Sequence, residues 1–264
     1  MLPKGISSWR SAGEGIVSLL FPSPCRLCGT LLESASRLPL CKRCLDSIQM
    51  LKGPICHRCG RPLPFATAGD TTNPLCQLCK RGVYAFELAR SFAVYDDCMV
   101  RAVTILKYEA VTSLGDWFAA RLGELVRSES LLQSPDLIIP VPLDPSRLRQ
   151  RRHNQAELIA RPLANRLGVP APSGLMRRTR ARPNRLKLTR RERWQTVRGA
   201  FEVIDTARVD KLRVLLVDVV FTTGATLDAS ARALLRAGAS NVWGLTVARV
   251  VSDWLSLGVI REKR

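Results

Sequence analysis

The stretch V214-L-L-V-D-V-V-F-T-T-G-A-T226 places an apolar run directly before a turn rich in Thr and Gly. The run is typical of a strand buried on both faces of a parallel sheet. A helix is expected over Thr226–Ala237 with Gly238 at its end, followed by a strand over Asn241–Val250. The order strand, turn, helix, strand predicts an α/β domain with a mostly parallel sheet.

The turn has the composition of a phosphate-binding loop. A turn that follows a parallel strand and opens a helix presents free N–H groups and the positive end of the helix dipole. Thr222, Thr223 and Thr226 add hydroxyl donors, and Gly224 permits close backbone approach. Asp218, just before the turn, could accept hydrogen bonds from sugar hydroxyls, which points to a sugar phosphate such as phosphoribosyl pyrophosphate. The alternative is that Thr226 merely caps a helix.

Positive charge is concentrated in one block of the chain. The 264 residues carry a net charge of +19 and are enough for an α/β domain of about 150 residues plus a smaller module. Between Arg147 and Arg198, sixteen Arg or Lys residues outnumber two acids, a net charge of +14. This block favours a polyanion or a phosphorylated substrate; the alternative is a solvated, solubilising face.

Eight of the nine cysteines form four C-x-x-C pairs, whose two-residue spacer points both sulfurs at one ion. The pairs are Cys25/Cys28, Cys41/Cys44, Cys56/Cys59 and Cys76/Cys79. Two pairs complete a tetrahedral shell of thiolates, which predicts structural zinc. Sequential pairing is the simplest arrangement, and interleaving stays open. Disulfides are the main alternative, but they suit secreted chains, and no export signal is found.

Other segments have the spacing of helices and strands. We expect strands over Leu88–Tyr95 and Asp136–Pro142, and helices over Met99–Lys107, Leu114–Val126 and Asn154–Leu167. Within the last of these, Pro162 implies a kink or a break. Because no apolar run reaches about 18 residues, a membrane span is not expected, and we expect a cytoplasmic chain.

The chain resembles the ComF family, in which a Cys-rich zinc module precedes a type I phosphoribosyltransferase-like domain. Val214–Thr226 is similar to the phosphoribosyl-pyrophosphate motif of type I phosphoribosyltransferases, which has a hydrophobic strand, two acids and a T-T-G-A-T-like loop. The supporting segments are I105-L-K-Y108, I139-P-V-P-L143, R147-x3-R151-x2-N154-Q155 and L188-x4-R193-x6-A200-F201.

The resemblance implies phosphoribosyl transfer from phosphoribosyl pyrophosphate bound with Mg²⁺. Asp218 would be the catalytic side chain. The substrate phosphates and ribose would contact Asp218, Thr222, Thr223, Gly224, Ala225, Thr226, Lys107, Arg147 and Arg151. The Arg-rich stretch 177–193 would be a mobile hood over the substrate.

Val219 departs from the family pattern, which has a second acid at this position. In the family both acids hold ribose hydroxyls. Loss of the second acid would therefore weaken ligand binding by about 1.5–3 kcal/mol. One interpretation is drift in a tolerant protein or a variant sequence. The other is a domain that retains phosphate binding and has lost efficient turnover.

A function of another class also fits the sequence. ComF-like proteins are linked to DNA uptake beside a DNA-translocating competence ATPase. The zinc module and the basic block suit a non-catalytic adaptor that binds single-stranded DNA or a protein partner. Aromatic residues make up 6% of the chain, which is few for a base-stacking platform.

We therefore expect four segments. An N-terminal helical segment covers 1–24, a zinc-ribbon domain 25–82, a phosphoribosyltransferase-like domain 83–254, and a basic tail 255–264.

Overall fold

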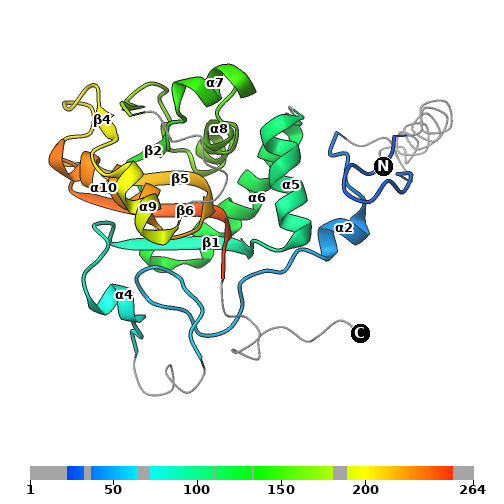
Figure 1. Ribbon diagram of the computed structural model, residues 1–264, viewed down its shortest axis with the longest axis horizontal. Coiled ribbons are helices and arrows are strands. Elements are labelled where there is room, and N and C mark those ends of the chain that lie inside the picture. The colour runs from blue at the N-terminus through cyan, green and yellow to red at the C-terminus, as the bar shows by residue number, and fades with distance from the viewer. Residues whose placement is uncertain are drawn as a thin grey trace, which may run out of the picture.

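A four-stranded parallel sheet forms the centre of the protein. The computed structural model describes residues 23–32, 37–64, 72–109, 111–132, 134–180 and 189–251. The strand order is β1-β6-β5-β2, and every neighbouring pair is parallel (Figure 1). The strands are β1 Leu88–Val94, β2 Leu137–Pro140, β5 Arg213–Phe221 and β6 Asn241–Arg249. The predicted α/β class with a mostly parallel sheet is confirmed.

Helices cover both faces of this sheet, as Figure 1 shows. They are α5 Asp97–Tyr108, α6 Thr112–Ser128, α7 Pro145–Arg151, α8 Gln155–Leu167, α9 Arg190–Val197 and α10 Ala225–Arg236, with a 3₁₀ turn, η1, at Ser130–Leu132. Each of the helices expected from apolar spacing is found, with ends that differ by at most two residues.

Strand β5 explains why the opening stretch is apolar at nearly every position. Leu215 and Val217 face a core shared with α5, α6 and α8. Val214 and Leu216 face a second core that includes α10. Because successive side chains of a strand point to opposite faces, both sets must be apolar.

Helix α8 continues through Pro162 without a break. Proline has no N–H to donate to the carbonyl of Leu158 one turn earlier. Gly115 of α6 lies against this carbonyl, since a Cβ at Gly115 would come within 2.7 Å of the Leu158 oxygen. The two helices therefore pack closely where the proline interrupts the bonding, and Gly168 ends α8 in the left-handed conformation.

A small antiparallel sheet lies beside the second core. It pairs β3 Met176–Arg178 with β4 Phe201–Val203. Helix α9 lies between these strands in the chain and starts with a capping box of Thr189 and Glu192. The stretch expected to form a hood thus contains β3 and the start of α9, and its residues 181–188 lie outside the described residues.

The described part of the Cys-rich module includes the short helices α2 Lys42–Asp46 and α4 Gln77–Lys80. The expected N-terminal helical segment and basic tail lie outside the described residues, apart from positions 23 and 24. Among the described helices, none has the length and apolar character needed to cross a bilayer.

Candidate functional site

The T-T-G-A-T segment forms the turn between β5 and α10. Gly224 has φ +79° and precedes the first residue of α10. A Cβ at this position would come within 2.6 Å of the Phe221 ring and 2.7 Å of the Tyr84 ring, so the turn requires glycine for both space and conformation. Within the described chain, no acceptor contacts the backbone N–H groups of Thr222, Thr223 or Gly224. These donors are available to an anion at the start of α10.

This turn borders a cleft of about 470 Å³ at the carboxyl ends of the parallel strands. Ligands of open α/β sheets bind at this edge. Most of the predicted site residues line the cleft: Lys107, Arg147, Arg151, Asp218, Thr222, Thr223, Ala225 and Thr226. Gly224 lies in the turn but is not part of the lining. One cavity therefore brings together residues that are more than 100 positions apart in the chain.

Asp218 sits near the end of β5 and lines the cleft. One of its carboxylate oxygens accepts a hydrogen bond from the backbone N–H of Val219 at 2.7 Å. This local bond fixes the side-chain direction at the point where the strand runs into the turn. Asp218 and Asp144 are the carboxylates among the described residues of the lining.

Arg151, which also lines the cleft, is held in place by two hydrogen bonds. It donates to the Tyr108 hydroxyl at 3.0 Å and to the Gln155 amide oxygen at 3.0 Å. Its guanidinium also lies over the Tyr108 ring, 4.8 Å from the ring centre. Asn154 caps α8 and donates to the carbonyl of Val141 at 3.1 Å. The two segments I105-L-K-Y108 and R147-x3-R151-x2-N154-Q155 therefore meet to shape one wall.

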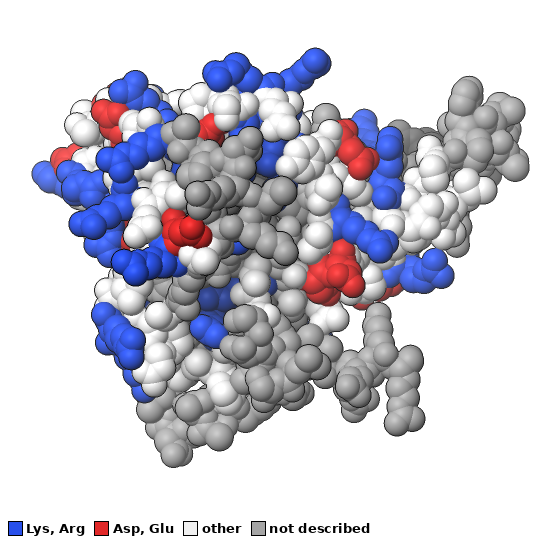
Figure 2. All heavy atoms as spheres, viewed as in Figure 1, with Lys and Arg blue, Asp and Glu red and all other residues white. Residues whose placement is uncertain are grey.

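The lining is rich in positive charge. Its basic side chains are Lys107, Arg147, Arg151, Arg178 and Arg193, against the two aspartates. Figure 2 shows Lys and Arg side chains gathered on the side of the molecule that carries β4, α9 and α10, and over α7. Exposed arginines on these elements include Arg149, Arg191, Arg232 and Arg236, and Arg198 follows the last residue of α9. Arg177, on β3 beside β4, is also exposed. Both the cleft and its surroundings suit an anionic ligand.

The eight paired cysteines form two separate clusters. Cys25, Cys28, Cys41 and Cys44 make the first, and Cys56, Cys59, Cys76 and Cys79 make the second. Within each cluster the sulfur atoms all lie within 4.8 Å of one another. The sequential pairing is the one observed, and His57 belongs to neither cluster.

The sulfur spacing fits zinc. A tetrahedral ion with Zn–S bonds of about 2.3 Å has S–S edges of about 3.8 Å. The Cys25–Cys44 and Cys28–Cys41 separations are 3.8 and 3.6 Å, and the Cys59–Cys76 separation is 3.7 Å. Both four-thiolate clusters are therefore consistent with structural zinc.

Backbone and hydroxyl donors support the thiolate ligands. The N–H of Cys41 donates to the Cys25 sulfur at 3.2 Å, and the N–H of Cys76 donates to the Cys56 sulfur at 3.3 Å. Hydrogen bonds from the side chain and backbone of Thr30 lower the pKa of Cys28 to about 5. Such bonds favour the charged form that a metal requires.

Comparison with known proteins agrees with both parts of the chain. Residues 16–80 match the family described as double zinc ribbon domain. The chain is 31% identical over 231 residues to the DNA utilization protein YhgH of Salmonella typhi, which covers 85% of this chain and 96% of that protein. The chain belongs to the ComF/YhgH family.

Other ComF/YhgH members and a solved structure are also similar. The competence protein ComFC of Bacillus subtilis is 25% identical over 221 residues, covering 80% of this chain and 84% of that protein. The purine phosphoribosyltransferase of Pyrococcus horikoshii is 18% identical with a TM-score of 0.32, covering 56% of this chain and 95% of that one.

Two residues of the cleft in this ComF/YhgH chain were not singled out from the sequence: Asp144, and Arg178, which was included only in the expected hood over 177–193. Arg178 of β3 lies in the lining, donates to the carbonyl of Thr196 at 3.3 Å and stacks on the Phe201 ring. Burial lowers the pKa of Arg178, while Asp144 and Asp218 oppose this shift. Asp144 is itself buried and caps α7 through the Ser146 N–H. Little in the sequence marks these two residues as part of a site. Neighbouring arginines, as at Arg177 and Arg178, and an Asp-Pro-Ser sequence, as at 144–146, are both common on protein surfaces.

Proposed function

We propose that this ComF/YhgH protein binds phosphoribosyl pyrophosphate in the cleft at the end of β5 and acts in DNA utilization or competence. The observation that carries the proposal is the turn at 222–224, which opens a helix at the edge of a parallel sheet and whose backbone donors have no acceptor among the described residues. The named activities of the relatives, DNA utilization and competence, support the biological setting.

Each part of the ligand has a counterpart in the cleft. The phosphate on the ribose would accept hydrogen bonds from the turn amides and from Thr223 and Thr226. The ribose hydroxyls would donate to Asp218. The pyrophosphate would lie against Arg147, Arg151 and Lys107, because charge-assisted bonds to phosphate are the strongest that these side chains make.

The cleft also fits the reaction that such a ligand undergoes. When the bond between the anomeric carbon and pyrophosphate breaks, the electron pair leaves with pyrophosphate, and an acceptor nucleophile forms the new bond. Lys107 and the cleft arginines would stabilise the negative charge on the leaving group, and Asp218 would hold the ribose in position. Mg²⁺ would supply further charge neutralisation. Its ligands would be mainly phosphate oxygens with Asp218 nearby, since Mg²⁺ is commonly held by one or two carboxylates plus substrate phosphates.

A non-catalytic adaptor is the second candidate. The exposed arginines on β3, α9 and α10 favour it, because single-stranded DNA is bound largely through its phosphates. In this function the partners would be single-stranded DNA and a DNA-translocating competence ATPase. The two functions use different surfaces, so one protein can have both.

Calorimetric titration with phosphoribosyl pyrophosphate tests the first proposal. We expect binding with Mg²⁺ present, and weakening of roughly ten- to a hundredfold in Asp218→Asn and in Thr223→Val. The first substitution removes the charge of an acceptor for the ribose hydroxyls, and the second removes a hydroxyl donor to the phosphate. Thr179→Val is the matched control: Thr179 is exposed and does not line the cleft, so its affinity should equal that of the wild type.

The adaptor gives the opposite pattern. Affinity for a single-stranded oligonucleotide would fall steeply with salt and would survive both cleft substitutions. A protein that binds the oligonucleotide in this way, and shows no heat with phosphoribosyl pyrophosphate, would disprove the first proposal.

A further inference from the structure

The two four-cysteine clusters occupy different environments. In the first, Cys28 is exposed and Cys41 and Cys44 are half-buried. In the second, the four cysteines are all buried, with exposures between 0% and 7%. They belong to the same hydrophobic core as Phe221 and Ala225, which flank the phosphate-binding turn. The second cluster is therefore part of the domain that forms the cleft.

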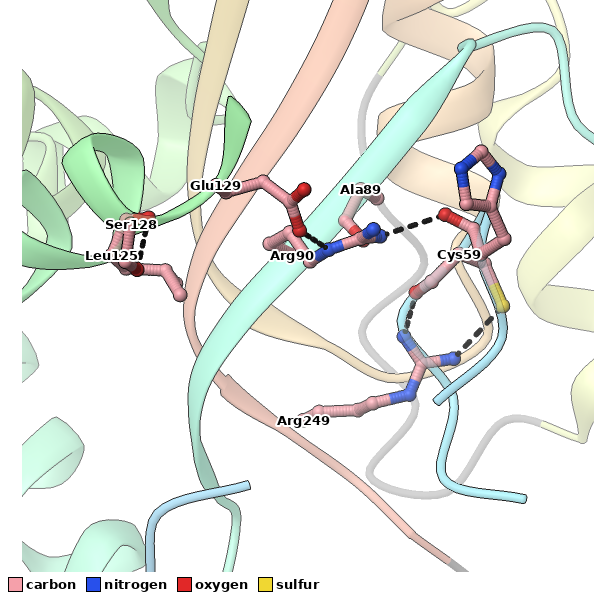
Figure 3. Close-up of polar contacts among 8 residues, drawn as sticks. Cys59, Ala89, Arg90, Leu125, Ser128, Glu129 and Arg249 are labelled. Carbon is pink, nitrogen blue, oxygen red and sulfur yellow. Dashed lines mark hydrogen bonds and ion pairs between the residues drawn. The ribbon is translucent and has the colours of Figure 1, made fainter. Parts of the chain in front are cut away.

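Arg249, the last residue of β6, joins this cluster to the sheet. Its guanidinium donates to the carbonyl oxygen of Cys59 at 2.6 Å and lies 3.7 Å from the Cys59 sulfur. Figure 3 shows the guanidinium directed at both atoms from the end of its strand. The side chain is 4% exposed, and its Nε atom is buried without a hydrogen-bond partner in the described chain.

A buried guanidinium needs a compensating negative charge. The partners that the structure gives Arg249 are a carbonyl, a sulfur and an aromatic ring, with no carboxylate among the described contacts. Zn²⁺ with four thiolates carries a net negative charge, and donors to its sulfurs tune such a site. The metal-loaded second cluster would therefore supply the charge that keeps Arg249 in place.

The opposite side of Arg249 contacts the phosphate-binding turn. Its guanidinium carbon lies 3.9 Å from the centre of the Phe221 ring, in cation–π geometry. The Phe221 ring packs edge-on against Tyr84, and the Tyr84 hydroxyl donates to the carbonyl of Thr223 at 2.9 Å. These two rings also occupy the space beside Gly224. A chain of contacts thus runs from Cys59 through Arg249 and Phe221 to the turn.

We propose that Arg249 is a positioning residue through which the metal of the second cluster orders the turn at 221–226, whereas the metal of the first cluster does not affect it. The ordering concerns the turn itself. That the ordered turn receives phosphoribosyl pyrophosphate rests on the function proposed above.

Amide hydrogen exchange of the full-length, zinc-loaded protein tests this coupling. Arg249→Gln keeps a polar end group on a shorter stem but removes the charge, and we expect it to retain two zinc ions. The hydrogen-bonded amides of 221–226, such as the Ala225 N–H that donates to the Thr223 hydroxyl at 3.4 Å, should exchange roughly tenfold faster. Arg249→Lys keeps the charge without the planar fork and should give a smaller increase. Unchanged exchange at 221–226 in Arg249→Gln would overturn the proposal.

Arg90→Gln is the matched control. Arg90 is also buried, lies on the neighbouring strand β1, and donates to the carbonyl of His57 at 2.9 Å (Figure 3). It differs in having a carboxylate partner, Glu129, and, among the described residues, it has no contact with the turn. We expect faster exchange around 56–60 and unchanged exchange at 221–226. Equal effects of the two substitutions on the turn would contradict a specific role for Arg249.

Stepwise removal of zinc from the wild-type protein provides a second test. This test needs no substituted protein and so does not depend on whether the Arg249 variants fold. The first cluster, which is more exposed than the second, should lose its ion first, with the turn unaffected. Loss of the second ion should raise exchange at 221–226, and the reverse order of effects would overturn the proposal. Hydrogen exchange and zinc content are measured without a ligand. Absence of phosphoribosyl pyrophosphate binding would therefore disprove the proposed function, and the exchange data would still decide whether Arg249 couples the second cluster to the turn.

Discussion

Val219 stands where a hydrophobic core meets the cleft. Its side chain is 6% exposed and packs in the cluster shared with α5, α6 and α8, yet it also lines the cavity beside Asp218. The first environment accounts for a valine in a buried strand. The second allows this position to face a ligand bound beside Asp218.

Val219→Asp should tighten binding of phosphoribosyl pyrophosphate by roughly ten- to a hundredfold, because a charged acceptor is added for a ribose hydroxyl. The same change should lower the melting temperature of the free protein, since a carboxylate replaces a buried apolar group. Calorimetry and thermal unfolding measure the two effects. Val219→Asn, of similar size but uncharged, is the control, and equal affinity of wild type and Val219→Asp would disprove the role assigned to this position.

Among the secondary-structure elements, β2 and β5 are joined at the start of their pairing by an ion pair between Asp136 and Arg213, which we call the clamp. Asp136 accepts hydrogen bonds from the Arg213 guanidinium at 2.7 and 2.9 Å and from the Arg213 backbone N–H at 2.9 Å. The Arg213 side chain, and then its backbone N–H, lower the pKa of Asp136 to about 2. Because the folded pKa lies below the unfolded value of about 3.9, the clamp stabilises the fold above pH 4 and is lost as the pH falls toward 2.

Asp136→Asn should therefore be less stable than the wild type near pH 7, with the difference vanishing as the pH approaches 2. The side chains of the pair are 34% and 43% exposed, so screening limits the effect to about 1 kcal/mol. Denaturant unfolding of both proteins across this pH range measures the difference in their free energies of unfolding. Zinc loss at low pH affects both proteins equally and therefore cancels in this difference. Glu202→Gln removes a more exposed pair with Arg177 and should cost about 0.5 kcal/mol or less. A pH-independent difference for Asp136→Asn would contradict this account.

Element length determined what the sequence could predict at this scale. Strands of seven to nine residues, and helices of twelve or more, carry enough apolar periodicity to be recognised, as β1, β5, α5 and α8 show. Strands β3 and β4 are three residues long, which is too short for an alternating pattern. Their pairing depends on the packing of Met176, Phe201 and Val203 in the second core.

At the scale of the whole molecule, short motifs were readable and long-range contacts were not. The C-x-x-C spacing indicates metal ligands, and the T-T-G-A-T turn indicates a phosphate, because each motif is complete within a few residues. The contact between Arg249 and Cys59 spans 190 positions, and that between Tyr84 and Thr223 spans 139. Neither pair carries a local signal, so the support of the turn by the second cluster emerges only from the folded chain.

A crystal structure of the protein with phosphoribosyl pyrophosphate and Mg²⁺ is the most direct measurement. The account predicts the ribose phosphate within hydrogen-bonding distance of the backbone N–H groups of Thr222, Thr223 and Gly224, with the ribose hydroxyls on Asp218. A ligand bound elsewhere, or a turn that stays empty at saturating ligand, would contradict it.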